Sequence, residues 1–557
     1  MKNRTTLALR ILVLLLFVAP AGLAQQKPAS NDTGDLAAYI DKAWDTLTRS
    51  MDNCEVILDR RVPEHSLLYL PADFPETDAL RKLGTRCKLA IEHLPQRITA
   101  PGTLSADKLP RQGVLYLPNP YVVPGGFFNE MYGWESYFII RGLLRAGRVK
   151  MAQGMVENFF FEIDHYGSIL NANRTYFLTR SQPPFLSSMV MGVYDALSDP
   201  KAKRAWLEKA YPYIQRDYDL WTHGEHLAGG TGLSRYFDYG QGPVPEIADM
   251  HDSYYRDVFT HIQASPERTE YLKDAGKPEG ATLIGPSFTF EACEQDEVGC
   301  LKSPTMKYTA DYYKGDRAMR ESGFDITFRF GPFGGSTHHF AAVCLNSLLY
   351  KAETDLEKIA TLLGKPSEAK QWVQRAQHRK ELVNKYLWDA STGMFFDYDF
   401  TKNKRSTYDY LTTFYPLWVG LATPQQAKAV TSHLKTFERS GGAMLSPYET
   451  GVQWDAPYGW APTELIAVEG MRRYGATADA DRVARKWVDT VDKNFRREGT
   501  IREKYNMETQ SSEANVTAGY KQNVVGFGWT NGVTLEFMHE LGMLKGKAAA
   551  AKTGSSQ

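Results

Sequence analysis

Apolar residues recur with the spacing of one helical face through most of this chain, whereas alternating, strand-like runs are few and short. Glycine and proline separate the apolar stretches. Gly364, Lys365 and Pro366, for example, divide two long helices, and Ser367 is the expected N-cap of the second. The pattern predicts helices over residues 36–50, 134–146, 151–164, 184–197, 201–221, 254–265, 339–363, 367–387, 409–421, 424–434, 462–474, 479–494 and 529–541.

These helices come in successive pairs, with long glycine- and aromatic-rich loops at alternate joints. This order predicts an all-α fold, an (α/α)6 toroid or barrel whose loops form a pocket, rather than an open bundle. We find no convincing internal boundary, so we predict one domain over residues 25–545 with an N-terminal helical extension. Residues 266–303 are polar and resemble an excursion from the core, and the tail over 546–557 is expected to be disordered.

The first residues have the pattern of a targeting segment. Lys2, Arg4 and Arg10 precede an apolar run over 11–19, and small residues follow at 22–24. We therefore predict a signal peptide over 1–24 and a periplasmic or secreted protein. No later apolar run reaches the roughly 18 residues of a membrane span, so no membrane association is expected.

Composition excludes some functions. The net charge is +0 at pH 7, which gives no electrostatic reason to expect nucleic acid. Aromatic residues make up 12% of the chain, which suits stacking on sugar rings, although large cores also use them. His338 and His339 have no further ligand at a useful offset, so we interpret them as a surface or core pair and predict no metal site.

The five cysteines fit an oxidising compartment only loosely. Cys54 and Cys87 could pair across the N-terminal helices. Cys293 and Cys300 could close a local loop. Cys344 lies within a helical apolar pattern and is expected to be a buried thiol.

Asp325 is the strongest candidate for acid chemistry. It follows Gly323 and Phe324, and Arg317 and Arg320 lie about one helical turn upstream. A carboxyl beside an aromatic wall is partly desolvated, which favours its neutral form and lets it donate a proton. The alternative is a helix end with a capping aspartate and solvated arginines.

Five loops combine glycine or proline with aromatic and polar side chains. They read PGGFFNEMYGWESY (124–137), NANRTYFLTRSQPP (171–184), QWDAPYGWAP (453–462), REKYN (502–506) and GFGWTNGV (526–533). Sugar hydroxyls need polar partners and sugar faces need aromatic platforms, so five such loops on one side of a helical ring would line a sugar pocket.

These segments resemble the trehalases of glycoside hydrolase family 37. The resemblance covers roughly residues 109–542. It rests on the two signature-like loops at 124–137 and 453–462, and on RSQPP (180–184), ESGFD (321–325), EKY (503–505) and GFGWTNG (526–532), which follow in the family's order.

The resemblance implies an inverting hydrolysis that needs no metal or cofactor. Carried onto this chain, Asp325 is the general acid and Glu503 the general base. Inversion requires the two carboxyls to stand about 6.5–9.5 Å apart, so that a water fits between base and sugar. Glu503 lies between Arg502 and Lys504, whose charges would help to keep it ionised if they point toward it. Without the motif, a surface ion pair would be the simpler interpretation of Glu503.

The resemblance also implies the residues that bind substrate. They are Phe128, Trp134, Glu135, Asn171, Arg180, Gln182, Glu246, Gly323, Trp454, Asp455, Trp460 and Trp529. Asp455 either contacts the sugar or braces its loop, and Trp460 and Trp529 are either platforms or packing. Arg329 is expected to brace the Asp325 loop.

Several family positions differ. Phe127 and Val244 stand where the family has arginines, and Glu135 replaces an aspartate. Phe324 replaces a tryptophan, Tyr458 an asparagine, and the glycine-rich run before GFGW is absent. Each lost guanidinium removes charge-assisted hydrogen bonds worth about 1.5–3 kcal/mol.

Three functions stay open at this stage. The first is a periplasmic α,α-trehalase that cleaves trehalose to two glucose molecules with inversion, and we expect it to be a monomer. The second is an inverting glycosidase acting on another disaccharide or α-glucoside, which the changed loops favour. The third is a non-catalytic sugar-binding protein. The intact acid and base argue against the third, because binding alone needs neither.

Overall fold

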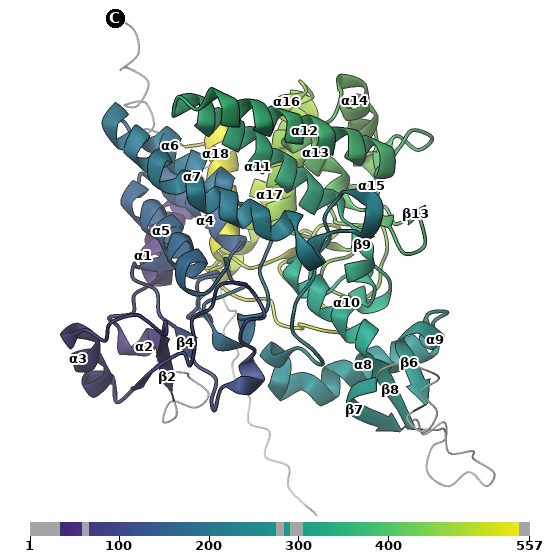
Figure 1. Cartoon of the computed structure of the whole chain (residues 1–557). Helices are drawn as coiled ribbons and strands as arrows, with labels where there is room; N and C mark the ends of the chain where they lie inside the picture. The colour runs from purple at the N-terminus through teal and green to yellow at the C-terminus, as the bar shows by residue number, and fades with distance from the viewer. Residues whose placement is uncertain (1–33, 58–65, 275–282, 290–304, 545–557) are drawn as a thin grey trace, which may run out of the picture.

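Six helices form a closed inner ring in the computed structural model, which describes residues 34–57, 66–274, 283–289 and 305–544 (Figure 1). Each helix packs against the next, and the last returns to the first. In ring order they are α4 (Glu135–Arg145), α6 (Leu186–Ala196), α11 (Val343–Leu362), α13 (Tyr415–Trp418), α16 (Ala461–Arg473) and α18 (Gly528–Glu540).

A second set of six helices covers the ring from outside. It comprises α5 (Val149–His165), α7 (Pro200–Thr222), α12 (Pro366–Tyr386), α14 (Pro424–Ser432), α17 (Thr477–Glu498) and α1 (Gly34–Leu47). α14 packs on the 3₁₀ turn η9 (Leu411–Phe414) that leads into α13, and the others pack directly on an inner helix. The all-α (α/α)6 prediction is therefore confirmed.

The two rings differ in sequence for a physical reason. Inner helices touch neighbours on every side, so residues 528–538 of α18 are all buried. At the α4–α18 crossing, a Cβ on Gly142 would lie 2.6 Å from the Cα of Gly532, so only glycine permits this approach. Outer helices bury one face, which gives the amphipathic pattern seen in the sequence.

Local signals fix several helix ends. Asp199 accepts hydrogen bonds from the amides of Lys201 and Ala202 at the start of α7, where Pro200 occupies the first turn. The predicted Ser367 cap is wrong: Pro366 already lies in the first turn of α12, so Lys365 holds the cap position. The segment predicted as one helix over 409–421 is instead η9 followed by the four-residue α13.

The N-terminal extension is not purely helical. A parallel sheet, in the order β3 (Ala90–His93), β2 (Leu67–Leu70), β4 (Val114–Leu115), accompanies α2 (Cys54–Ile57) and α3 (Asp78–Cys87). The predicted Cys54–Cys87 disulfide is confirmed, and Cys344 is a buried free thiol as expected. The Cys293–Cys300 pair and the tail over 546–557 lie outside the described residues.

The polar excursion after residue 266 belongs to a second, smaller unit beside the ring. It contains α8 (His251–Gln263), α9 (Arg268–Tyr271) and an antiparallel sheet of β6 (Leu272–Asp274), β8 (Thr305–Thr309) and β7 (Leu283–Thr289) (Figure 1). Of these elements, α8, α9, β6 and β8 share an apolar cluster with α10 (Ala310–Glu321). α10 then leads the chain back toward Asp325.

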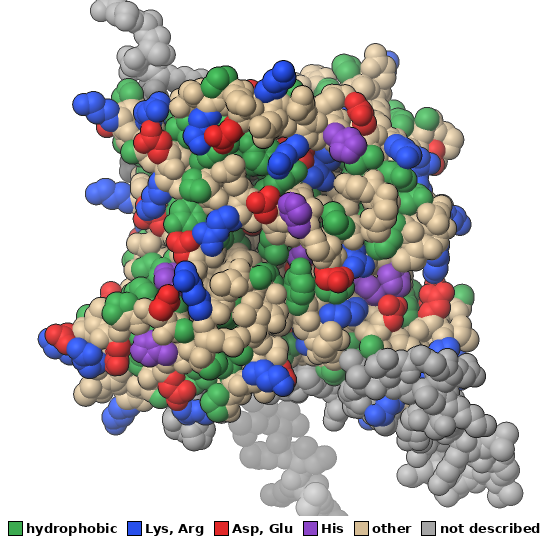
Figure 2. Space-filling view, in the orientation of Figure 1, with side chains coloured by type: hydrophobic (Ala, Val, Ile, Leu, Met, Phe, Trp, Pro, Cys, Tyr) green, Lys and Arg blue, Asp and Glu red, His purple; other side chains and the backbone are tan. Residues whose placement is uncertain are grey.

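The visible surface mixes charges of both signs. Figure 2 shows lysine and arginine interspersed with aspartate and glutamate on this face, in keeping with the net charge of zero. Of the helices in the described ranges, none combines the length and apolarity that crossing a membrane requires.

Candidate active site

A cavity of about 640 Å³ opens among the loops at one end of the ring. All five predicted loops contribute to its wall, together with residues from the α8 region and from residues 519–524. Of the predicted site residues, those that line it are Phe128, Glu135, Asn171, Arg180, Gln182, Glu246, Gly323, Asp325, Trp454, Trp460, Glu503 and Trp529. Side chains from distant parts of the chain thus face one space.

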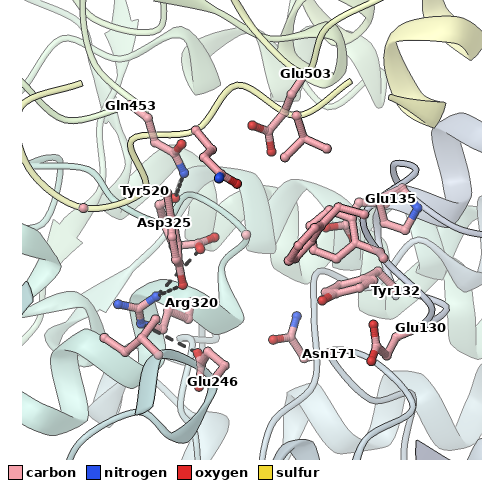
Figure 3. A pocket seen from close by; sticks show the side chains of 18 of the residues that line it. Glu130, Tyr132, Glu135, Asn171, Glu246, Arg320, Asp325, Gln453, Glu503 and Tyr520 are labelled. Atoms are coloured by element: carbon pink, nitrogen blue, oxygen red, sulfur yellow. Dashed lines mark hydrogen bonds and ion pairs between the residues drawn. The ribbon is translucent and has the colours of Figure 1, made fainter. Parts of the chain in front are cut away.

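Asp325 reaches the cavity through a sharp turn after α10. Gly323 has φ of +76°, and a Cβ there would lie 2.6 Å from the Trp134 ring. Glycine is therefore required both for the backbone conformation and for the close contact with the ring. The Gln453 amide donates to the Asp325 carbonyl, which ties this turn to the 453–462 loop (Figure 3).

The environment of Asp325 favours its protonated form. Burial raises the pKa of this carboxyl to about 7, although the guanidiniums of Arg320 and Arg180 pull in the opposite direction. Arg320 Nη1 lies 3.9 Å from Asp325 Oδ2, and the aspartate side chain keeps 27% of its surface exposed. A carboxyl with such a pKa can hold a proton near neutral pH and deliver it to a bound group.

Glu503 is placed quite differently. Lys504 is fully buried, and its Nζ lies 2.7 Å from Glu503 Oε2. Arg502 points away and pairs with Glu498 at 2.7 Å. The Trp529 indole donates to the Glu503 carbonyl at 3.3 Å. Of the two flanking cations considered in the sequence, only the lysine therefore holds this carboxylate.

The two carboxyls occupy separate parts of one pocket. In Figure 3, Asp325 lies beside Arg320 while Glu503 lies on another wall, and Tyr132 and Glu135 face them from a third. No hydrogen bond or ion pair joins Asp325 to Glu503 within the described structure. The space between them is open to a ligand.

Arg320 is a pocket residue that sequence reasoning did not assign. Its side chain is only 2% exposed, with Nε 3.4 Å from Asp316 and 3.8 Å from Glu246, and Nη1 bonds the Tyr520 hydroxyl. Nε and Nη2 have no hydrogen-bond partner among the described residues. The spacing of Asp316 and Arg320, one helical turn apart, was the available signal.

A second guanidinium lies on the same side of the pocket and shares Glu246 with Arg320. Arg180 donates to Asn171 Oδ1 at 2.9 Å and to Glu246 Oε1 at 2.5 Å. Burial would raise the pKa of Glu246, but Arg180 and Arg320 outweigh it and hold that pKa below its usual value. Glu246 is therefore a fixed negative charge that orients both arginines.

Glu135 contributes a third carboxyl. It is the first residue of α4, and burial raises its pKa to about 8, with smaller additions from Asp325 and Glu503. Its Oε2 finds no hydrogen-bond partner in the described part of the chain. This group is thus neutral at pH 7 and can donate a hydrogen bond to a ligand.

The tryptophans play unequal parts. Trp454 and Trp460 stack with ring centroids 4.0 Å apart and planes 5° apart, and Trp529 meets Trp460 edge-on at 5.6 Å. All three line the cavity, whereas Trp134 lies outside its lining and packs behind Gly323. Trp134 therefore shapes the wall through its neighbours.

Asp455 also lies outside the lining. Its side chain is fully buried, accepts hydrogen bonds from Thr450 Oγ1 at 2.8 Å and the Phe328 amide at 2.9 Å, and is further bonded by Thr327 and Ser446. With both oxygens engaged inside the loops, the geometry supports bracing rather than sugar contact.

The structure also locates two residues that differ from the family, Phe127 and Val244, and the predicted brace Arg329. Phe127 sits at the pocket mouth with 65% of its surface exposed, and Val244 is fully buried in the apolar cluster under α10. Arg329 forms a bidentate pair with Asp397 at 2.6 and 2.7 Å, away from the cavity, and so braces the Asp325 loop as expected. Arg317 and Arg320 are buried, which excludes the alternative of solvated arginines.

A helical toroid with a proton-holding carboxyl, a lysine-paired carboxylate and stacked tryptophans around one pocket defines a glycoside hydrolase. Comparison with known proteins carries this further. The trehalase family model matches residues 22–542. The chain belongs to the trehalase family.

Individual relatives agree over nearly the whole chain. The cytosolic neutral trehalase of Neurospora crassa is 35% identical over 554 residues, which cover 88% of this chain and 71% of its own. That of Saccharomyces cerevisiae is 36% identical over 548 residues, with 88% and 69% covered. The solved structure of the neutral trehalase Nth1 from Saccharomyces cerevisiae matches with a TM-score of 0.72 at 31% identity, over 91% of this chain and 94% of that one.

The relatives correct one prediction. Six relatives are named cytosolic neutral trehalases, so the predicted periplasmic or secreted location is wrong. The signal peptide predicted over 1–24 lies outside the described residues and gains no support from these names. An apolar N-terminal run was therefore insufficient evidence for the compartment.

Proposed function

We propose that the protein is an inverting α,α-trehalase that hydrolyses trehalose to two glucose molecules. The observation that carries the proposal is the contrast between two carboxyls in one pocket, with burial raising the pKa of Asp325 to about 7 and a buried ammonium pairing with Glu503. Inverting hydrolysis needs this division into a proton donor and a proton acceptor.

Asp325 gives its proton to the glycosidic oxygen as the bond from that oxygen to the anomeric carbon breaks. A water on the opposite face of the ring attacks this carbon, and Glu503 takes up the proton that the water releases. One glucose leaves with its original configuration and the other leaves inverted. Asp325 ends ionised and Glu503 protonated, and exchange with solvent restores both.

The remaining pocket residues hold the sugar. Arg180 and Arg320 bind hydroxyls on the acid side, where Glu246 keeps both guanidiniums aimed. Charge-assisted bonds of this kind contribute about 1.5–3 kcal/mol each. Neutral Glu135 donates to an acceptor oxygen, and Trp454, Trp460 and Trp529 supply apolar surface for the ring faces.

The test is early-time NMR of the products. Inversion at one carbon of an α,α-linked disaccharide releases equal amounts of α- and β-glucose, whereas retention releases α-glucose alone. Asp325→Asn and Glu503→Gln should each lower turnover at least about a hundredfold while circular dichroism stays unchanged. Near-normal activity in either variant would reject the assignment of that residue.

A second candidate is hydrolysis of another disaccharide or α-glucoside. Exposed Phe127 at the mouth and buried Val244 remove two expected guanidiniums, which favours this alternative. Arg320 replaces one of them in the pocket, which favours trehalose. A panel of glucosides distinguishes the two candidates. If trehalose is hydrolysed faster than the others by orders of magnitude, the alternative is excluded. If another glucoside is hydrolysed faster than trehalose, the first proposal is excluded. A monomer also remains our prediction, to be checked by light scattering.

A further inference from the structure

Two adjacent histidines and one aspartate converge away from the pocket. Asp311 lies in the first turn of α10, and His338 and His339 end the 3₁₀ turn η8 (Thr337–His339). Asp311 Oδ1 lies 3.0 Å from His338 Nε2 and 3.3 Å from His339 Nε2. We call these three residues the His–His–Asp cluster.

The spacing in the cluster matches a metal-ion site. Ligand atoms about 2.0–2.1 Å from a tetrahedral zinc ion lie roughly 3.3 Å from one another. The separation of 3.3 Å equals this value and the separation of 3.0 Å is slightly shorter, and all three ligand atoms lie within 4.8 Å of one another. Both rings present the same nitrogen, Nε2, to the same carboxylate oxygen, so an ion can replace the shared contact with small side-chain movements.

The backbone holds the two histidines in place before any ion binds. Arg235 Nη1 donates to the His338 carbonyl at 2.9 Å. The His339 amide donates to the Ser336 carbonyl at 2.8 Å, and its carbonyl accepts from the Phe400 amide at 3.1 Å. Such anchoring reduces the ordering cost of assembling ligands from two segments.

The cluster also has suitable charge and access. Asp311 supplies one carboxylate, and the two imidazoles can each offer a ring nitrogen to a cation. Asp311 is 53% exposed and His339 22%, so an ion can enter and keep a water as its fourth ligand. Two imidazoles with one carboxylate suit zinc better than magnesium or calcium, which prefer oxygen ligands alone.

The other acidic group with metal-like spacing offers a useful contrast. Glu469, Glu536 and Glu540 also gather their carboxylates. Each of them is already paired with an arginine, at 2.6 Å for Arg141–Glu469 and 2.7 Å for Arg145–Glu536. Three guanidinium charges exclude a cation there, whereas Asp311 pairs with the two imidazoles and with no arginine among the described residues.

We propose that the His–His–Asp cluster binds one divalent zinc-like ion, with water as the fourth ligand. The ion clamps the start of α10 to the turn that precedes β9 (Phe340–Ala341) and α11. Because α10 carries Arg320 at its far end and leads to Asp325, the clamp fixes the base of the acid-bearing segment. None of the three ligands lines the pocket, so the ion stabilises the fold and takes no part in hydrolysis.

The test uses the purified full chain, stripped with chelator and titrated with ZnCl₂ by calorimetry and thermal unfolding. We expect one ion per chain, and a melting temperature about 2–3 °C higher when free zinc reaches a hundred times its Kd. CoCl₂ should give the intense visible bands of a tetrahedral site. Asp311→Ala and His339→Ala should lose the zinc-dependent shift, whatever their melting temperature without metal.

His378→Ala is the matched control, because it removes an exposed histidine from α12, which contributes no residue to the cluster. It should bind zinc as the wild type does. The proposal is overturned if the wild type binds no zinc at 100 times the protein concentration. It is equally overturned if both cluster variants keep the wild-type shift, since zinc would then bind elsewhere.

Discussion

Replacing Arg320 with glutamine should move the alkaline limb of the pH–rate profile to higher pH. In the wild type, burial raises the pKa of Asp325 to about 7, and Arg320 is the largest influence acting against that rise. A nearby cation favours the ionised carboxylate, so its removal raises the pKa further. Asp325 then keeps its proton to higher pH, and if it is the proposed general acid, activity falls at a higher pH than in the wild type.

The structure sets the size of this shift. Arg320 Nη1 lies 3.9 Å from Asp325 Oδ2. Unit charges at about 4 Å interact by about 1 kcal/mol in water and about 4 kcal/mol at an effective dielectric constant of 20, and one pKa unit is about 1.4 kcal/mol. Because Asp325 is 27% exposed, we take the lower part of this range and expect a shift of about 1–2 units.

The other charges near Asp325 do not reverse the direction of this expected pKa shift. Glu246 also faces Arg320, and without that guanidinium its negative charge is less compensated, which again raises the pKa of Asp325. Arg180 still holds Glu246 at 2.5 Å, and two tyrosine hydroxyls still donate to Asp316 at 2.8 and 3.1 Å. The buried acids therefore keep partners, and the fold should survive.

The assay is kcat/KM for glucose release from trehalose between pH 4 and 10, which reports ionisation in the free enzyme. The readout is the pH at which the alkaline limb falls. The maximal value of kcat/KM is not used, because losing sugar contacts will lower it as well. Arg320→Lys keeps the charge, and Tyr520→Phe removes only the hydroxyl bonded to Arg320. Both should stay near the wild-type limb. An unmoved limb in Arg320→Gln would refute the link between this guanidinium and the acid.

Three further predictions concern the same loop. Asp325→Asn should stabilise the protein against urea, and the gain in unfolding free energy should grow by up to about 3 kcal/mol from pH 5 to pH 8. The pKa of Asp325 near 7 in the folded state exceeds its unfolded value, so ionisation of the wild-type aspartate opposes folding as pH rises. A gain that does not change with pH would contradict the raised pKa. Gly323→Ala should lower kcat about a hundredfold, since its Cβ would strike Trp134 and displace the acid, whereas unaltered kinetics would show a tolerant turn. Arg329→Met should cost about 3–5 kcal/mol in unfolding free energy by leaving Asp397 buried and unpaired, and adding Asp397→Asn should recover part of it.

The ring was predictable because its helices carry strong, repeated signals. Long apolar faces divided by proline and glycine, as at residues 364–366, place most helix ends within a few residues. The failures have local causes. α13 is four residues long and wholly buried, so no amphipathic period marks it. β2 is a four-residue buried run, and buried parallel strands lack the alternation that identifies a strand.

The site was partly predictable for a different reason. Loop motifs carry their own chemistry, so Asp325, Glu503 and the loops around them could be named from the sequence. Contacts that join distant segments could not. Asp311 meets His338 across 27 residues, and Arg320 meets Tyr520 across 200, and no local pattern encodes either meeting.

Arg320 shows how counting lost family residues can mislead. The sequence has Val244 where the family has an arginine, and that loss alone suggests weaker binding of a sugar. In the structure, Val244 is buried beneath α10, while α10 itself sends a guanidinium into the pocket beside Glu246. A sugar hydroxyl needs a guanidinium at a particular position in the pocket, and that guanidinium can be carried by a helix as well as by a loop. The substrate preference should therefore follow the positions of the guanidiniums in the pocket rather than the motif letters, and Arg320→Gln measured on trehalose against other glucosides separates the two.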